Sequence, residues 1–127
     1  MKKNKITISI NKPIKEVFEF TINPKNTHLW VSSIKEEIAE EYPPKINTQY
    51  KNRGNGYNWD FYKVLELEEN KKFTLVDLQE NYHVRYTYKI IDGNKTEIEY
   101  FEWMNKGELN NPLTRDSLIK LKSAIEN

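Results

Sequence analysis

Few side chains in this sequence could carry acid–base or nucleophilic chemistry, and they lie far apart. The chain has no cysteine, which excludes thiol nucleophiles, cysteine metal sites and disulfides. An imidazole titrates near neutral pH, so His83 is the first candidate for a general base. However, His83 alternates with aromatic residues along a predicted strand, and we expect it to face solvent on the outer side of a sheet. His28 should also lie on the surface. With two distant histidines, we expect no metal site and no cofactor.

Glu102 is a stronger candidate for a functional side chain. It shares the period-two phase of Tyr100, so it could place a carboxylate inside the protein. Such a group is costly unless it is paired or protonated. The alternative is a bulge near Tyr100 that turns Phe101 and Trp103 inward and Glu102 to water. Of the two arrangements we favour the bulge.

Two other segments have weaker signals for chemistry. Asp77 is in phase with Phe73 and Leu75, but its strand alternates too poorly for its inner face to be chosen. The stretch Arg53-Gly54-Asn55-Gly56 is rich in glycine. It lacks the spacing and the following helix of a phosphate-binding loop, so it is interpreted as a hairpin turn.

Charge and length limit the classes of partner. The chain has 127 residues, with 20 basic and 19 acidic side chains that are interspersed. A sustained positive field is therefore missing, which argues against nucleic acid as a partner. The basic first five residues are followed by no apolar stretch, so we expect a cytoplasmic protein without stable membrane insertion. The many lysines and asparagines suggest an AT-rich, bacterial genome.

The hydrophobic pattern predicts one α+β domain over residues 1–127. Helical spacing of apolar residues predicts a short helix at 13–22, a further turn at 24–30 and a last helix at 112–126. Alternating patterns predict strands at 5–10, 33–39, 46–50, 57–67, 73–78, 82–91 and 96–104. Tight turns at Asn55-Gly56 and Asp92-Gly93 connect these strands into an antiparallel meander.

The last helix should pack one side on this sheet. Asn111 and Pro112 look like an N-cap and a proline at the first helical position. Leu118, Leu121 and Ile125 then form an apolar stripe opposite charged residues. The helix would be about 15 residues long.

The order of strand, two short helices, six strands and final helix resembles the helix-grip fold of the START and polyketide cyclase (SRPBCC) superfamily, which includes the birch pollen allergen. The segments that carry the resemblance are ITISINKPIKEVFEF, NPKNTHLW, YKVLELEENKKF and DGNKTEIEY. The resemblance implies a curved antiparallel sheet of about seven strands around the C-terminal helix, with an apolar cavity between them. Members bind lipids, aromatic polyketides, hormones and other hydrophobic molecules, and they share no catalytic motif.

The leading hypothesis is a module that binds a small hydrophobic or aromatic molecule in this cavity. For each aromatic residue plain packing is the favoured role, but the set as a whole should include part of the cavity wall. One alternative is an enzyme of the polyketide cyclase or dehydratase type, and another is an accessory module of a chaperone ATPase. The oligomeric state stays open. The expected wall residues are Trp30, Tyr50, Trp59, Phe61, Phe73, Tyr86, Tyr88, Tyr100, Glu102, Leu118 and Leu121.

Overall fold

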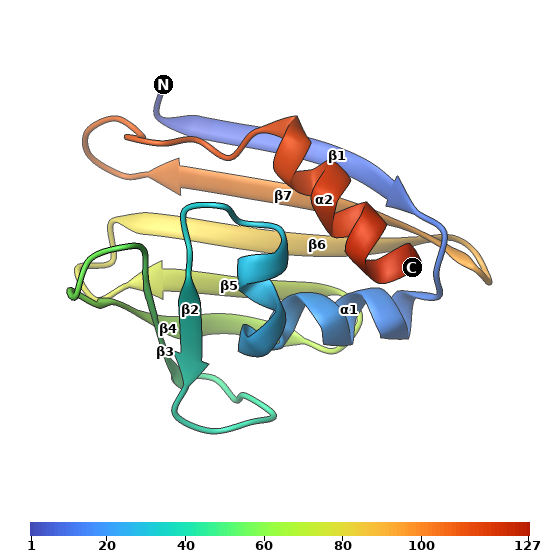
Figure 1. Ribbon diagram of the computed structural model, residues 1–127, viewed down its shortest axis with the longest axis horizontal. Coiled ribbons are helices and arrows are strands. Elements are labelled where there is room, and N and C mark those ends of the chain that lie inside the picture. Colours follow the sequence, from blue (N-terminus) through green and yellow to red (C-terminus); the bar gives the residue numbers. More distant parts are fainter.

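Seven strands form one antiparallel sheet in the computed structural model, which describes residues 1–127 (Figure 1). The spatial order is β1-β7-β6-β5-β4-β3-β2, so consecutive strands from β2 to β7 are hairpin neighbours and β1 pairs with β7. The predicted meander is confirmed. The strands are β1 (Lys3–Ile10), β2 (Glu36–Ala39), β3 (Gln49–Arg53), β4 (Asp60–Glu68), β5 (Lys72–Asp77), β6 (Tyr82–Asp92) and β7 (Lys95–Met104).

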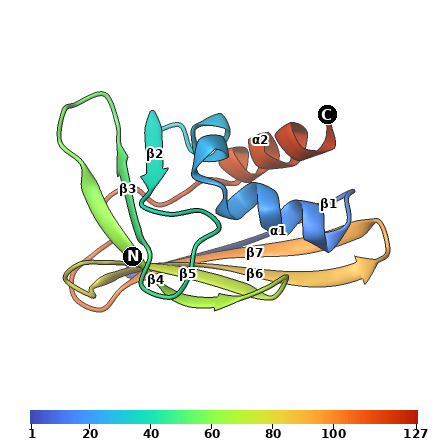
Figure 2. The same ribbon diagram turned by 90° about the horizontal axis from the view of Figure 1, so that it is seen from below.

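Three helical segments cover one face of this sheet (Figure 2): α1 (Ile14–Ile22), the 3-10 helix η1 (Pro24–Leu29) and α2 (Arg115–Glu126). α1 begins directly after Pro13, whose fixed φ of −60° suits a helix start. It ends before Asn23, whose side chain accepts a hydrogen bond from the Lys25 backbone N–H and so opens η1. No helix is both long and apolar enough to cross a membrane.

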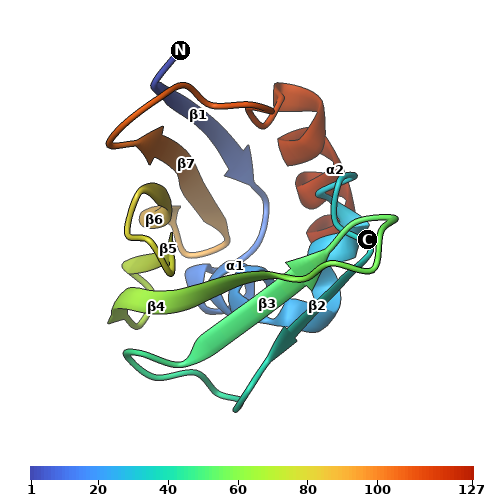
Figure 3. The ribbon, with the colours of Figure 1, turned by 90° about the vertical axis from the view of Figure 1, so that its left-hand side faces the viewer.

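The sheet curls so that its concave face holds the helices (Figure 3). A bulge in β4 between Val64 and Glu66 adds one residue to that strand, and bulges increase bending and twist. The two edges of the sheet are thereby brought round the helices. This is an α+β, helix-grip-like architecture, as the sequence predicted.

The apolar stripe of α2 is part of the closed core. Leu118 and Leu121 are completely buried, and Ile125 is nearly so. They pack with apolar residues of α1 and β1 and with Trp30, which follows η1. Removing this much apolar surface from water is what holds a short helix on a sheet.

The start of α2 differs from the prediction. The helix begins at Arg115, after an extended Thr114 with φ −100° and ψ 161°, and Pro112 lies before it. The reason is a competing contact, because the Leu113 backbone N–H donates a 2.7 Å hydrogen bond to the Glu102 carboxylate. The side chain of Asn4 also donates to the Leu113 carbonyl, so this residue is held in a straight segment beside β1 and β7.

Candidate ligand-binding cavity

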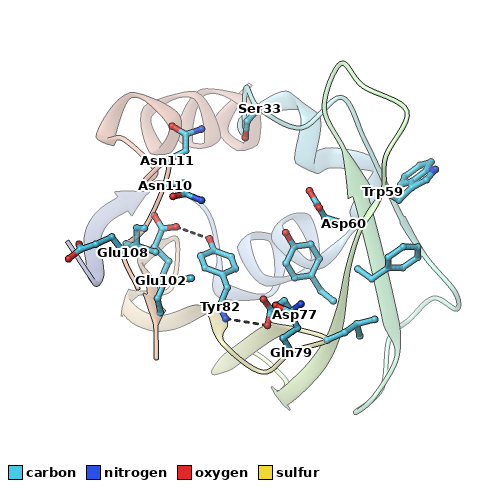
Figure 4. Close-up of a pocket in the computed structure, with 15 residues that line it drawn as sticks. Ser33, Trp59, Asp60, Asp77, Gln79, Tyr82, Glu102, Glu108, Asn110 and Asn111 are labelled. Carbon is cyan, nitrogen blue, oxygen red and sulfur yellow. Dashed lines mark hydrogen bonds between the residues drawn. The ribbon is translucent and has the colours of Figure 1, made fainter. Parts of the chain in front are cut away.

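A hollow lies beside the closed core, on the concave side of the sheet (Figure 4). Its inner part, called the inner cavity below, has a volume of about 240 Å³, and its outer part, the mouth, of about 600 Å³. The two parts are continuous because they share the lining residues Ser33, Asp60, Tyr62, Tyr82, Glu102 and Asn111. Apolar lining of the inner cavity comes from Val31, Ile34, Leu75, Val84 and Leu113, and its remaining polar lining includes Thr27, Glu37, Asn52, Tyr86 and Tyr100.

The wall around this hollow comes from segments far apart in sequence. Tyr62, Tyr82 and Tyr100 project from β4, β6 and β7, and the segment just before α2 contributes Leu113. The segment after η1 packs against Gly54 and completes the wall. A Cβ atom on residue 54 would lie only 2.9 Å from the Ser33 carbonyl oxygen. Glycine is therefore needed for this close approach.

Glu102 points into the hollow and is only 2% exposed. Its Oε1 accepts a 2.7 Å hydrogen bond from the Tyr82 hydroxyl (Figure 4). Its Oε2 accepts bonds from the Asn4 side chain at 3.0 Å and from the Leu113 N–H at 2.7 Å. Three donors around one buried carboxylate connect β1, β6 and the segment before α2, which makes Glu102 a structural centre of the wall.

The favoured alternative of a bulge near Tyr100 is wrong. β7 pairs without interruption with both neighbours from Glu97 to Trp103. Phe101 and Trp103 therefore lie on the outer face, stacked on each other with ring centres 4.8 Å apart. Glu102 keeps the inward phase of Tyr100.

Tyr82 and Tyr62 are edge-to-face neighbours in the wall, with ring centres 6.4 Å apart. Burial raises the pKa of the Tyr82 hydroxyl well above its usual value, and the nearby Glu102 carboxylate adds to this shift. Burial likewise raises the pKa of Tyr62 to about 12. Both hydroxyls hence stay protonated near neutral pH, and the Tyr82 hydroxyl donates its proton to the hydrogen bond with Glu102.

Glu37 is a second carboxyl group on the inner cavity, and no pattern in the sequence marks it as an inward residue. It comes from β2, the edge strand farthest from β1. Thr27 donates a 2.6 Å hydrogen bond to its Oε1 and Asn52 a 3.2 Å bond to its Oε2. Burial raises the pKa of Glu37, and these two bonds oppose that rise only in part.

Because the pKa of Glu37 is raised in the folded protein, we expect its contribution to the free energy of unfolding to fall as the pH rises. The unfolded chain loses this proton near the ordinary glutamate pKa of 4.5, while the folded chain keeps it to a higher pH. Between the two pKa values the folded state binds more protons, so the free energy of unfolding falls with increasing pH. Urea denaturation between pH 5 and 8 should show this fall, and Glu37→Gln should flatten it.

Glu69→Gln is the matched control because Glu69 is exposed in a turn. The carboxyls of Glu66, Glu108 and Glu126 have lowered pKa values, so their contribution is lost only in more acidic solution. An equal slope for Glu37→Gln and Glu69→Gln would show that Glu37 is not the responsible group.

The structure separates the eleven predicted wall residues into three groups. Tyr86, Tyr100 and Glu102 line the inner cavity. Trp59 and Phe61 lie at the mouth, where Trp59 points away from the hollow and under the cations of Lys51 and Arg53 (Figure 4). The others are packed in the core, away from the lining: Trp30, Tyr50, Phe73, Tyr88, Leu118 and Leu121.

The bulge in β4 explains why Tyr62, and not Phe61, faces inward. Leu67 packs against the core, and counting back from it by two gives Phe61 and Trp59 as inner residues. The extra residue between Val64 and Glu66 reverses this phase. In β2 the phase is also opposite to the apolar pattern, since Glu37 lines the cavity and Ile38 is exposed.

The other candidates for chemistry lie outside the inner cavity. His28 is exposed. His83 is on the outer face as predicted, but it is only 9% exposed because its ring stacks on Trp103 at 4.5 Å. Asp77 lines the mouth, where its Oδ1 accepts hydrogen bonds from the Asn81 and Tyr82 backbone N–H groups. No group of three or more His, Cys, Asp or Glu side chains is arranged to hold a metal ion.

Comparison with solved structures decides the fold. A START superfamily protein from Mycobacterium smegmatis superposes with a TM-score of 0.75 and 12% identity, over 99% of this chain and 98% of that one. The chain has the START-type helix-grip fold. XoxI from Bacillus cereus matches with a TM-score of 0.76 and 11% identity, over 100% and 97% of the two chains.

Other solved structures with a similar fold are different proteins. One is an Aha1 dimer from Colwellia psychrerythraea, with a TM-score of 0.62 and 13% identity over 98% of this chain and 90% of that one. No protein-family model and no curated protein matches the sequence. At these identities the likeness establishes the fold alone.

Proposed function

We propose that the START-type chain binds a small hydrophobic or aromatic molecule in the inner cavity, and that residues 1–127 work as one binding unit. The observation that carries the proposal is the hollow itself, which stands open beside a core whose central side chains are fully buried. Val84, Leu75 and Leu113 offer apolar surface, and tyrosine rings offer edges and faces for stacking. A concave, partly apolar site with a few directed polar groups is typical of small-molecule binding.

Filling the cavity tests this proposal. Val84 lies on the lining, so the larger ring of Val84→Phe should enter the hollow and change the free energy of unfolding by less than about 1 kcal/mol. The same change at Val17, which is completely buried in the closed core, should cost about 1–3 kcal/mol. Compounds from a hydrophobic panel that raise the melting temperature of the unaltered protein should bind Val84→Phe at least about tenfold more weakly.

Tryptophan fluorescence and thermal shift report the binding, and urea denaturation reports the stability. The proposal fails if no compound of the panel binds the unaltered chain. It also fails if the compounds bind Val84→Phe with unchanged affinity, because their site would then be elsewhere.

A second candidate function is an enzyme of the cyclase or dehydratase type, in which a carboxyl group moves a proton on a bound hydrophobic substrate. The specific support is Glu37, a carboxyl group on the inner cavity with a raised pKa. The hydrogen-bonded pair of Tyr82 and Glu102 on the other wall would orient the substrate. An enzyme of this type should turn over its substrate, and Glu37→Gln should abolish the turnover while the substrate still binds. That result would establish catalysis and not binding alone.

A further inference from the structure

The charged groups around the hollow all have the same sign. The inner cavity and mouth together are lined by the five carboxylates of Glu37, Asp60, Asp77, Glu102 and Glu108, and by no Lys, Arg or His. This is unusual for a chain with nearly equal numbers of basic and acidic residues. Glu108 is neutralised locally by the N-terminal ammonium group of Met1. The other four have no such partner.

Partly buried carboxylates elsewhere in the protein include two that are paired with cations. Glu66 forms salt bridges with Lys72 and Arg85 on the outer face, both at 3.0 Å, and Glu126 pairs with Lys122. Glu102 and Glu37, in contrast, accept hydrogen bonds only from hydroxyl, amide and backbone N–H groups. These neutral donors orient the two carboxyl groups but supply no counter-ion, and the raised pKa of Glu37 reflects the cost of a charge in this desolvated site.

An unused polar group lies at the same place. Tyr86 is only 8% exposed and lines the inner cavity, yet its hydroxyl makes no hydrogen bond with another group of the chain. The hydroxyl oxygen is not among the fully enclosed side-chain atoms that lack a partner, so it opens onto the hollow. The hydroxyl is therefore free for a group that enters the hollow.

Tyrosine rings surround this position. Tyr86 lies 5.7 Å from Tyr100 between ring centres, and Tyr62 lies 6.4 Å from Tyr82. The face of an aromatic ring attracts a cation, most strongly where water is excluded. Carboxylates and tyrosine rings together form an environment that stabilises positive charge.

We propose that the inner cavity binds a protonated amine, as part of a small molecule with an apolar or aromatic body. Its ammonium group would lie between Glu37 and Glu102, donate hydrogen bonds to their free lone pairs and to the Tyr86 hydroxyl, and face the tyrosine rings. The apolar body would pack against Leu75, Val84 and Leu113. This inference rests on the proposed function and adds the chemical class of the ligand.

The mouth agrees with this choice of ligand. Asp60 lies there without a hydrogen bond or ion pair from its side chain and points toward the hollow (Figure 4). A carboxylate at an entrance attracts a cation and repels an anion, so the approach favours the same charge as the interior.

Three nearly isosteric probes test the inference directly: 2-phenylethylamine, 2-phenylethanol and 3-phenylpropionate. Calorimetric titration of the full chain at neutral pH and low salt should give an affinity for the amine at least about tenfold above that for the alcohol. The carboxylate probe should not bind measurably. The amine must also raise the melting temperature of the protein.

Charge-removing variants locate the site. Glu37→Gln and Glu102→Gln should each weaken binding of the amine by about tenfold or more, and should weaken the binding of the alcohol by a much smaller factor. Asp60→Asn, at an exposed position, should have a smaller effect of about two- to fivefold and keeps the test valid if Glu102→Gln folds poorly. Glu66→Gln removes a carboxylate from the outer face and is the matched control, with unchanged affinity.

The outcomes separate this inference from the proposed function. If the alcohol or the carboxylate probe binds as well as the amine, or if the amine binds equally to Glu37→Gln and Glu102→Gln, the inference is overturned and a hydrophobic site remains. If no amine binds while compounds of the hydrophobic panel do, the result is the same. If nothing binds, the proposed function falls as well.

Discussion

Leu118→Ala should lower the free energy of unfolding by about 3–5 kcal/mol, the largest effect that we expect for a single truncation. Leu118 is completely buried in the core cluster that joins α2 to α1 and the sheet. Removing its side chain deletes apolar burial and leaves a void that rigid neighbours cannot fill. For a short helix held by one apolar stripe, that loss is a large share of a typical domain stability. Urea denaturation at neutral pH measures it.

Ile119→Ala is the control on the same helix. Ile119 is 48% exposed, so its truncation should cost less than about 1 kcal/mol. If the two variants were equally stable, α2 would not be held by this stripe, and the closed core described above would need revision.

Glu102→Ala should lower the free energy of unfolding by about 2–4 kcal/mol. The variant removes the acceptor of the Tyr82 hydroxyl and of the Leu113 N–H, and one of the two acceptors of the Asn4 amide. Donors that lose a buried partner are costly. The Leu113 N–H should in addition exchange with solvent much faster, which hydrogen exchange followed by NMR measures at a single amide.

Glu99→Ala is the matched control for Glu102. Glu99 is also in β7, with the opposite phase and no hydrogen-bonded partner for its side chain, so its loss should be within about 0.5 kcal/mol. Unchanged protection of the Leu113 amide in Glu102→Ala would contradict the role of Glu102 as the centre of the wall.

The architecture could be predicted because its signals are local. In β6, Tyr86 and Tyr88 lie on the concave face and His83 on the outer face, as the alternating pattern predicts. The turn at Asp92-Gly93 joins β6 to β7, which fixes an antiparallel neighbour directly. Such features depend on backbone geometry and period alone, and they led to a fold that the solved structures confirm.

The errors arose where tertiary contacts override local preference. Pro112 is a good first residue for a helix, but Glu102 holds the next residue in an extended segment, and α2 begins at Arg115. One extra residue in β4 reverses the phase of Tyr62 and Phe61, and no sequence signal marks that bulge. Glu37 faces inward because Thr27 and Asn52 donate hydrogen bonds to its carboxyl group on that side. Both partners belong to other elements of the fold.

The same limits apply to the cavity. An aromatic inner face was expected, but the sequence does not tell which rings fill the core and which surround a hollow. Phe73 and Trp30 are in the core, while Tyr62 and Tyr82 form the wall. Whether a ring is in the core or in the wall depends on where the helices end, because beyond their ends they no longer cover the sheet. The negative character of the cavity comes from carboxyl groups that point inward, and strand alternation alone could not predict their direction.

An NMR titration that follows the backbone amide signals of the isotope-labelled protein tests most directly whether a ligand binds in the inner cavity. The ligand is the compound with the largest thermal shift among the hydrophobic panel and the three phenyl probes. The account predicts saturable shifts at the amides of Leu75, Val84 and Leu113, with little change at Val17 and Leu121 in the closed core. Shifts confined to the outer face around His83 and Trp103, or no saturable shift with any compound, would contradict it.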